Sequence, residues 1–375
     1  MGPIKPLTSI LNIPRELWEK AATGSSPFLQ YDFFYALEKS RSIGQESGWT
    51  PLYFVDETEP AIFYSFVKDH SYGEYIFDWQ WANAYQENGL AYYPKLTSMI
   101  PFTPITTTHF IMPQFKPEVA LGLLDSYQGL YEKHQLSSSH FLFLTQAEIP
   151  FFQNQGYLIR ESMQYHFFND NFETFEDCLK KMKGRKAKQL RKERLFPELK
   201  IERFTGESLL PEHAEQMYQF YLSTLDQKNA IDYLKKDFFL MVFESMKQNI
   251  LYVQASTDNQ AIAGSLFFYD TEKLYGRYWG CFQEVQYLHF ELCYYQGIDF
   301  CLEKKLKVFE AGAQGEHKIS RGFRPTRTFS AHKLKNEQFH HAVANFINQE
   351  KKQVALTIEE LSLQLPFSEE KISHE

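Results

Sequence analysis

The segment Lys273–Gly312, KLYGRYWGCFQEVQYLHFELCYYQGIDFCLEKKLKVFEAG, decides the fold class predicted for this 375-residue chain. Its two ends, Lys273–Gly280 and Lys307–Gly312, are short apolar and aromatic runs that predict strands. Between them, apolar side chains recur at steps of three and four residues, which predicts a helix with one buried stripe. The stripe consists of Leu288, Leu292, Tyr295, Ile298, Leu302 and Leu306. A strand–helix–strand crossover is right-handed and places its two strands parallel in one sheet, so the segment predicts an α/β fold.

The first half of the chain repeats this order of elements. Each half shows a predicted hairpin, a strand, a helix, a second strand and a loop, and SYGEYIFDW at 71–79 takes the slot of LYGRYWG at 274–280. The hairpins are PLYFVDE with AIFYSFV, and ILYVQAS with GSLFFYD. Two copies of one unit, each of roughly 180 residues, fit the chain length. We therefore predict an α/β (α+β) chain of two tandem units, each a mixed twisted sheet flanked by helices.

A basic tract separates the two halves. The run Lys180–Arg194, KKMKGRKAKQLRKER, holds nine basic residues and one acidic residue. It has few apolar anchors, so it does not read as an ordinary core helix. We predict a domain boundary just before it, near Asn171, which gives domains 1–171 and 172–375. Three interpretations of the tract stay open: a solvated charged helix, a contact for a phosphate-bearing donor such as transfer RNA or a nucleotide, and a contact for anionic lipid.

The bulk composition limits the function classes. The formal net charge of −8 argues against general nucleic-acid binding but leaves room for a local basic patch. No stretch approaches the ~18 apolar residues of a membrane-spanning helix, and the N-terminal segment lacks the apolar run of a signal peptide. The four cysteines show no CxxC spacing, so reduced thiols are expected. These features predict a cytoplasmic protein.

The loop 313–327 follows the second predicted strand of the crossover and concentrates charged and small residues. Open α/β sheets place their ligands just past the carboxyl ends of their parallel strands. Glu316 and His317 are therefore candidate general bases, and His317 is favoured by an imidazole pKa near neutrality. Guanidinium and ammonium groups in the loop would bind a phosphate or carboxylate, unless they only form surface salt bridges. The candidate substrate-binding residues of the loop are Gln314, Lys318, Arg321 and Arg324.

Arg277 lies inside an otherwise aromatic strand, where a charge is costly unless it is paired or faces a cavity. Strand alternation would place Tyr275, Arg277 and Trp279 on one face. That face would line an acyl or acceptor pocket and would give Arg277 a catalytic role; the alternative is a structural ion pair. Further candidate substrate-binding residues, at strand-to-helix junctions in the two halves, are His289, Glu291, Asp78 and Trp81.

Five strings of the sequence carry a family resemblance. They are FDWQWANAYQENGLAYYPKL, PFTP, LYGRYWG, LHFELCYYQGI and GAQGEHKISRGF. Together they closely resemble the bacterial predicted N-acyltransferases described as FemAB-like, which have a tandem GNAT fold, and the resemblance covers nearly the whole chain. The resemblance implies that the strands Lys273–Gly280 and Lys307–Gly312 splay apart around an acyl donor. It also implies that the second domain is catalytic and that the first only helps to form the groove.

The implied activity is transfer of an acyl or aminoacyl group to an amine acceptor, either a small molecule or a peptide, in cell-wall or peptide chemistry. The implied donors are acyl-coenzyme A or aminoacyl-tRNA, as co-substrates and not as tightly bound cofactors. Gly280, Gly312 and Gly315 would let the donor approach the backbone. The Gly-x-Gly spacing that holds a coenzyme A pyrophosphate is missing after Gly280, although a helix start there would still offer free N–H groups to an anion.

The chemistry of amine acylation needs a base, hydrogen-bond donors for the oxyanion, and a positioned donor and acceptor. It needs no enzyme nucleophile, and the sequence has no Gly-x-Ser-x-Gly elbow. Two other function classes stay open: a non-catalytic GNAT-like pair that binds a ligand or partner, and a nucleic-acid-binding protein that uses Lys180–Arg194. A zinc site of His289, Glu291, His317 and His332 would lack paired-ligand spacing, so no metal is predicted.

Overall fold

The computed structural model describes Ile4 and residues 6–312 and 315–368. The chain forms two compact units: unit 1 comprises Met1–Ser162 and Arg327–Ala355, and unit 2 comprises Met163–Thr326 and Leu356–Glu375. Whereas the sequence suggested one boundary near Asn171, the chain passes between the units three times. Each crossing point falls inside a single strand or helix, which a sequence pattern does not divide between domains. These elements are β6 (Leu158–Phe168), β12 (Arg324–Leu334) and α12 (Glu337–Ser362).

Unit 1 is built on a mixed sheet with the strand order β1-β2-β3-β5-β12, and β4 pairs with β2. Its further strands are β1 (Trp49–Asp56), β2 (Ala61–Lys68), β3 (Lys95–Ser98), β4 (Phe110–Ile111) and β5 (Ser138–Leu144). β3 and β5 run parallel, with Leu96 opposite Ser139, and β1 and β2 form the predicted hairpin. The right-handed crossover of this unit is therefore β3, α4 and β5.

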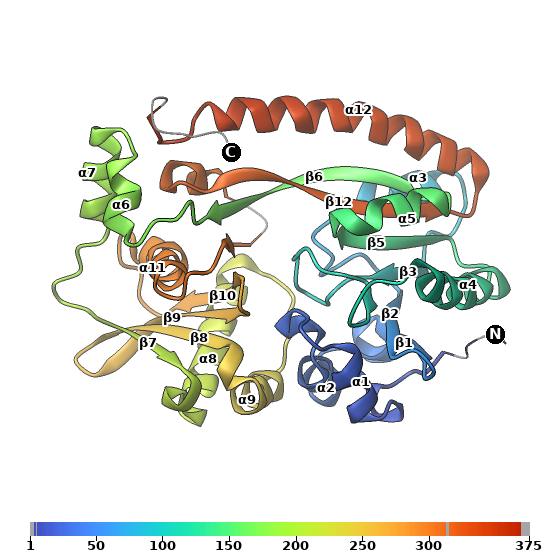
Figure 1. Cartoon of the computed structure of the whole chain (residues 1–375), viewed down its shortest axis with the longest axis horizontal. Helices are drawn as coiled ribbons and strands as arrows, with labels where there is room; N and C mark the ends of the chain where they lie inside the picture. The colour runs from blue at the N-terminus through green and yellow to red at the C-terminus, as the bar shows by residue number, and fades with distance from the viewer. Residues whose placement is uncertain (1–3, 5, 313–314, 369–375) are drawn as a thin grey trace. The chain divides into compact units, whose positions relative to one another are not determined.

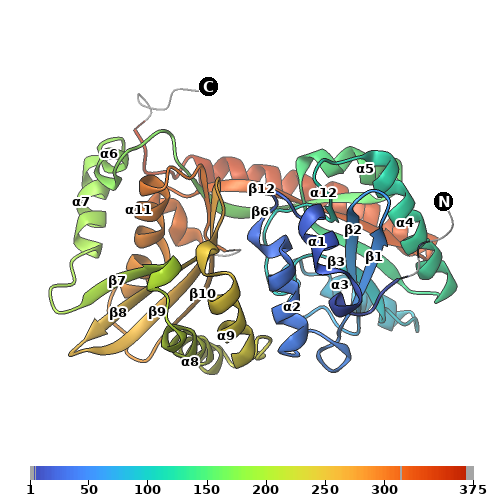
Figure 2. The same cartoon turned by 60° about the horizontal axis from the view of Figure 1, so that its bottom comes forward.

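Helices cover both faces of the unit 1 sheet. They are α1 (Arg15–Ala21), α2 (Tyr31–Lys39), α3 (Trp79–Glu87), α4 (Pro117–Lys133) and α5 (Ile149–Asn154). Figure 2 shows α1 and α2 on one side of β1 and β2, with α4 on the other. The core under α4 is aromatic: Tyr127 packs edge-on against Phe63, at 5.1 Å between ring centroids, and against Phe141 at 5.7 Å. The high aromatic content thus fills the interior.

Unit 2 has the strand order β6-β11-β10-β9-β8-β7. Its further strands are β7 (Lys200–Thr205), β8 (Ile250–Thr257), β9 (Gln260–Tyr269), β10 (Lys273–Cys281) and β11 (Val308–Glu310). Its helices are α6 (Phe175–Lys180), α7 (Gly184–Glu193), α8 (Pro211–Lys228), α9 (Lys236–Ser245), α10 (Leu288–Phe290) and α11 (Gln296–Glu303). α8 and α9 lie on one face of the sheet and α11 on the other (Figure 1). β10 and β11 are parallel, so the predicted crossover is confirmed.

The predicted repeat is displaced by one element in the first half. Residues 71–78, expected to form the strand matched to β10, form an irregular loop, and α3 follows as an additional helix. The strand prediction at 71–79 is therefore wrong. Its physical cause is Lys95, whose buried ammonium binds Ser71, Glu74 and Asp78 and draws those side chains inward.

Each unit has a mixed sheet flanked by helices, which confirms the predicted fold class. Among the helices of the described residues, none combines the length and the apolar character that a membrane crossing needs.

Gly280 lies where helix α8 approaches β10. A Cβ atom at this position would come within 1.6 Å of the Phe220 carbonyl oxygen. Because the clash is with backbone, it cannot be relieved by a rotamer change, and α8 would have to move. We expect Gly280→Ala to lower the free energy of unfolding by about 1–3 kcal/mol in urea titrations.

The matched control for this substitution is Gly129→Ala in α4. A Cβ at Gly129 would meet open space. Replacing a helical glycine with alanine there should stabilise the protein by about 0.5–1 kcal/mol. Equal unfolding midpoints for Gly280→Ala and the wild type would show that the contact between α8 and β10 is loose.

Candidate active site

A wedge opens between the parallel strands β10 and β11. Their pairing spans three residue pairs, from Lys273 opposite Val308 to Tyr275 opposite Glu310. β10 then continues to Cys281 with β9 on its other side, and a cavity of about 120 Å³ lies beside it. Its polar and aromatic lining includes Arg277, Tyr278, Trp279, His289, Cys293 and Tyr294. β11 is paired with β10 along its whole length, and the cavity lies just past its end, at the place where the family resemblance implies a wedge.

Arg277 reaches the cavity through a β-bulge. In the pairing of β10 with β9, Gly276 lies opposite Phe267 and Tyr278 lies opposite Leu266, so Arg277 is the inserted residue. A bulge changes which face the following side chains occupy. The predicted alternation is accordingly broken: Arg277 and Trp279 line the cavity, whereas Tyr275 is buried and donates a hydrogen bond to Asp270 at 3.0 Å.

The helix after β10 contains a π-helical turn at the cavity. This turn, Glu291–Tyr295, joins α10 to α11 and carries Cys293 and Tyr294. π-turns are uncommon and occur frequently at functional sites. His289 precedes the turn and packs edge-on against Trp279, at 5.2 Å between ring centroids. The wide turn shifts the helical register. Cys293 and Tyr294, which do not belong to the predicted apolar stripe, therefore face the cavity.

The loop after β11 closes into a short 3-10 helix, η8 (Glu316–Arg321). Gly315, at a φ of +113°, precedes it, and a Cβ there would come 2.7 Å from the His317 ring, so glycine is required for this turn. Glu316 and His317 are exposed, and His317 Nε2 lies 2.8 Å from the Tyr294 hydroxyl. Gln314 lies outside the described residues.

Both histidines near the wedge are held neutral. Burial lowers the pKa of His289 to about 4, and the charge of Lys318 adds to the effect. Burial, followed by the charges of Arg321 and Lys318, lowers the pKa of His317 below its ordinary value. Neutral imidazoles can accept a proton, so His317, which reaches Tyr294 and is exposed, has the protonation state of a general base at neutral pH.

Lys318 is a buried cation of the loop. It is 2% exposed, and its Nζ donates to the Gly312 carbonyl at 2.9 Å, at the end of β11. Burial lowers its pKa to about 7, so charged and neutral forms coexist near neutral pH. Among the described residues that line the cavity none is acidic. The site therefore suits a substrate with an anionic group or a developing oxyanion.

The other predicted charged residues of unit 2 form ion pairs within the fold. Arg324 pairs with Asp170. Glu291 is buried, and its carboxylate accepts from Nε and Nη2 of Arg194, each at 3.0 Å. Arg321 is buried and pairs with Glu193 at 2.7 Å. These three residues do not line the cavity.

The basic tract comprises the last residue of α6, a short turn and α7, and it has two faces. Its C-terminal residues Glu193 and Arg194 point into unit 2, where Arg194 also binds Asp299 at 2.6 Å. The outward side chains are exposed and basic. They are Lys180, Lys183, Arg185, Lys188, Arg191 and Lys192, of which Arg191 pairs with Glu176 and Lys180 with Asp177.

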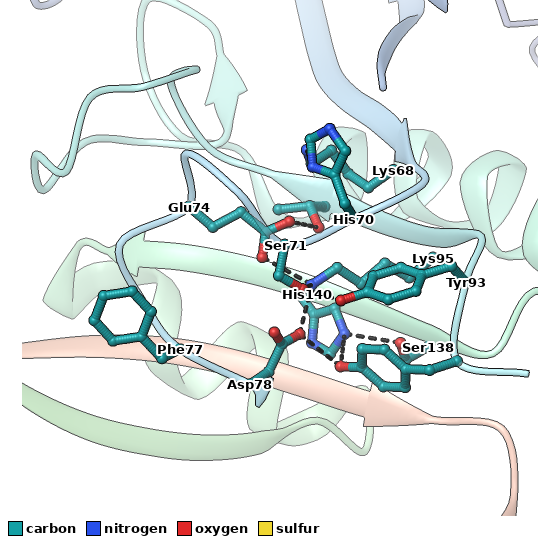
Figure 3. A network of polar contacts seen from close by, with 12 residues as sticks. Lys68, His70, Ser71, Glu74, Phe77, Asp78, Tyr93, Lys95, Ser138 and His140 are labelled. Carbon is teal, nitrogen blue, oxygen red and sulfur yellow. Dashed lines mark hydrogen bonds and ion pairs between the residues drawn. The ribbon is translucent and has the colours of Figure 1, made fainter. Parts of the chain in front are cut away.

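Asp78, predicted to bind substrate, belongs to a buried polar network in unit 1 (Figure 3). Trp81, also predicted to bind substrate, is buried, and its ring centroid lies 6.1 Å from that of His140. Lys95 Nζ donates to Asp78 Oδ2 at 2.5 Å and to Glu74 Oε2 at 2.8 Å. The Tyr92 hydroxyl donates to Asp78 at 2.6 Å and lies 3.2 Å from His140. The members of this network are 5% exposed or less, which suits structural support better than substrate contact.

His140 continues this network to a second histidine. Its Nδ1 lies 2.8 Å from His332 Nδ1, and the His332 ring packs edge-on against Trp81 at 4.9 Å. Burial lowers the pKa of His140 to about 3 and that of His332 well below its ordinary value. Both rings are therefore neutral, and one donates to the other. Within the described part of the chain, no three His, Cys, Asp or Glu side chains are grouped to hold a metal ion.

Sequence reasoning missed several residues of the wedge. Tyr294, Cys293 and Ser265 line it but were not predicted as site residues, although Cys293 and Tyr294 lie in the string LHFELCYYQGI. Glu193, which pairs with Arg321 of the loop, was also missed. Its signal in the sequence is that it is the single acidic residue in a run of nine basic residues. A lone acid in such a run invites the question of what it pairs with.

Comparisons with known proteins agree with this architecture. The FemAB-like family model, described as peptidoglycan biosynthesis/recognition, matches residues 9–369. The solved structure of FemX superposes with a TM-score of 0.54 at 8% identity, covering 91% of this chain and 100% of that chain. L-PGS from Bacillus licheniformis gives 0.50 at 9% identity, covering 84% and 96%. A conserved protein of unknown function from Bacteroides thetaiotaomicron gives 0.50 at 10% identity, covering 88% and 98%.

At these identities the structural likeness shows the fold alone: the chain shares the fold of FemX over nearly its whole length. A search of curated proteins found no match. The family model spans nearly the whole chain, and the protein belongs to the FemAB-like family of peptidoglycan biosynthesis/recognition.

Proposed function

We propose that this protein is an N-acyltransferase that moves an acyl or aminoacyl group from an activated donor to an amine in cell-wall chemistry. The observation that carries the proposal is the cavity between β10 and the residues after β11. Two residues of its lining contact the adjoining loop: the Tyr294 hydroxyl meets the neutral imidazole of His317, and the Gly312 carbonyl accepts from the buried ammonium of Lys318. Membership of a peptidoglycan biosynthesis/recognition family supports a cell-wall acceptor.

In this mechanism, the donor carbonyl enters the cavity and the acceptor amine attacks it. His317 Nε2 donates its hydrogen to the Tyr294 oxygen, 2.8 Å away, which leaves the lone pair on Nδ1 to take the amine proton. Lys318, in its charged form, stabilises the tetrahedral oxyanion. The new carbon–nitrogen bond forms, the bond to the leaving group breaks, and the proton passes from His317 to that leaving group.

The mechanism requires no acyl-enzyme. Burial raises the pKa of the Cys293 thiol, the one cysteine that lines the cavity among the described residues, so it stays protonated and is a poor nucleophile. The leaving group is the thiolate of coenzyme A or the ribose oxygen of an aminoacyl-tRNA. We propose that the exposed cations of α7 contact the phosphates of such a donor, as a co-substrate contact and not a cofactor site.

A donor panel tests the proposal. The protein would be incubated with acyl-coenzyme A and aminoacyl-tRNA donors and an amine or muropeptide acceptor, and product would be detected by mass spectrometry. We expect His317→Ala to lower kcat by roughly 10²–10⁴-fold. His134→Ala, at the exposed end of α4, is the matched control and should keep full activity.

Glu316→Gln decides between the two neighbouring candidates for the base. Glu316 is exposed and next to His317. We expect this variant to retain most of the turnover. Full turnover in folded His317→Ala together with a collapse in Glu316→Gln would move the base to Glu316. Tight binding of donors without any turnover across the panel would favour the non-catalytic alternative.

A further inference from the structure

Glu193 is an isolated acid on the basic helix α7, and its side chain faces inward. It is 2% exposed. One carboxylate oxygen accepts from Arg321 Nη2 at 2.7 Å and from the Tyr295 hydroxyl at 2.5 Å, and the other accepts from Gln189 at 2.8 Å. A carboxylate buried this deeply needs such partners, because burial without them is costly.

Arg321 carries this contact to the reaction loop. Its Nη1 donates to the His317 carbonyl at 2.8 Å, and its guanidinium lies 3.5 Å above the Phe290 ring centroid. Phe290 in turn lies 5.4 Å from the His317 ring. A chain of short contacts therefore runs from Glu193 through Arg321 to both the backbone and the ring of His317.

The charges around His317 explain why an acid is needed there. The groups that face His317 are the Tyr294 hydroxyl, His289, Lys318 and Arg321, with Glu316 beside it in sequence. Lys228 adds a further positive charge that acts on His289. The charges of Arg321 and Glu193 also act on Lys186, a further cation of α7. In this cationic surrounding, Glu193 is the buried negative charge in direct contact with Arg321.

We propose that Glu193 is a positioning residue of the acyl-transfer site, which acts through Arg321 to fix His317 over the wedge and to balance the charge beside it. The inference rests on the proposed function. It gives α7 two roles, because the helix that exposes cations outward also supplies the support of the reaction loop. The alternative is that Glu193 only fastens α7 to the core, and then its charge would not affect His317.

Two variants and a control separate these interpretations. Glu193→Gln keeps the shape of the side chain and removes its charge, and Glu193→Asp keeps the charge on a shorter side chain. Glu176→Gln removes a carboxylate of α6 that pairs with Arg191 of α7. Both of these side chains are about half exposed. Thermal unfolding monitored by circular dichroism confirms that each variant is folded.

The first measurement needs no substrate. NMR titration of labelled histidines in the full chain follows the midpoint of His317, assigned with His317→Ala. With Glu193 neutral, the charge of Arg321 is no longer balanced and further disfavours the imidazolium. We expect Glu193→Gln to move the midpoint to lower pH, and we expect Glu193→Asp to return it toward the wild-type value. The Glu176→Gln midpoint should equal that of the wild type.

The second measurement is transfer kinetics with the active donor and acceptor pair. We expect Glu193→Gln to lower kcat by about 10–10²-fold, because a base displaced by about 1 Å loses this much, while KM for the acceptor changes less than about twofold. An unchanged His317 midpoint in folded Glu193→Gln would falsify the positioning role. If the wild type shows no transfer at all, the proposed function fails, and the titration still decides whether Glu193 controls His317.

Discussion

Lys318→Met is expected to lower kcat/KM for acyl transfer by about 10²–10³-fold, which is the loss seen when one oxyanion donor is removed. The side chain is buried at the end of β11, and its Nζ is held by the Gly312 carbonyl at the mouth of the wedge. Met has a similar length and no charge. The substitution therefore removes the cation and keeps the packing.

The pH profile identifies the role of Lys318. Wild-type kcat/KM should rise as His317 loses its proton, below the ordinary pKa of 6.5, and fall as Lys318 loses its charge at about pH 7. Lys318→Met should keep the acidic limb and lose the alkaline limb. If Lys318 were instead the general base, wild-type activity would climb through pH 7, and a profile of that form would reject the oxyanion role.

Stability should change in the opposite direction from activity. Because folding lowers the pKa of Lys318 from 10.5 to about 7, the unfolded chain binds more protons between these values. This group therefore makes the protein more stable as pH rises from about 7 to 10.5, by roughly 1.4 kcal/mol per pH unit, and costs stability at lower pH. Lys318→Met should remove this slope and unfold at a higher temperature at pH 7.

The control for Lys318→Met is Lys307→Met in the same unit, where the exposed Lys307 pairs with exposed Glu272. This variant should change neither activity nor the pH slope of stability. Urea unfolding between pH 6 and 9, together with steady-state kinetics, measures both effects. A variant that loses activity and stability together would indicate that Lys318 supports the loop and not the chemistry.

The crossover of unit 2 could be predicted because its signals are local. The apolar stripe of the helix after β10 and the strands on either side lie within one segment of the chain. Because such crossovers are right-handed, the two strands are expected to be parallel in one sheet. The bulge at Arg277 could not be predicted in this way, because it exists only in the pairing of β10 with β9. For the same reason, the burial of Lys318 depends on a carbonyl that only the folded loop places beside it.

The loop 71–78 shows how a local pattern can mislead. Tyr75 and Phe77 are exposed, whereas Glu74 and Asp78 are buried, so outward aromatic and inward polar side chains imitate the alternation of a strand. The inward groups do not face a core; they surround Lys95, which is 17 residues further along the chain from Asp78. Because the sequence pattern has no information on that partner, the strand prediction failed there.

Lys95→Met is expected to produce the largest loss of stability in unit 1. Lys95 is fully buried, and the substitution leaves the carboxylates of Glu74 and Asp78 buried without their cation. Removing one partner from a buried ionic cluster costs about 3–5 kcal/mol. We expect a decrease of this size in the free energy of unfolding, measured by urea titration at pH 7. Hydrogen exchange should become faster in residues 69–78, where three of the Lys95 contacts originate.

The matched control is Lys116→Met, which breaks the exposed ion pair with Glu59 and should leave the free energy of unfolding nearly unchanged. A triple variant with Lys95→Met, Glu74→Gln and Asp78→Asn removes the orphaned charges as well. It should recover part of the loss, because the penalty comes from unpaired carboxylates and not from lost packing. Equal losses in the single and triple variants would contradict this explanation.

The pH dependence of the Lys95→Met penalty provides the decisive test of its electrostatic origin. In the wild type, burial opposes the charge on Asp78, but Lys95 outweighs it and holds the pKa of Asp78 below its usual range; burial raises the pKa of Glu74. Without the ammonium, both pKa values should lie above those of the unfolded chain, so the folded state gains protons and stability as pH falls. The difference in unfolding free energy between wild type and variant should therefore shrink from pH 7 toward pH 5. A constant difference over this range would mean that the Lys95 side chain stabilises unit 1 by packing alone.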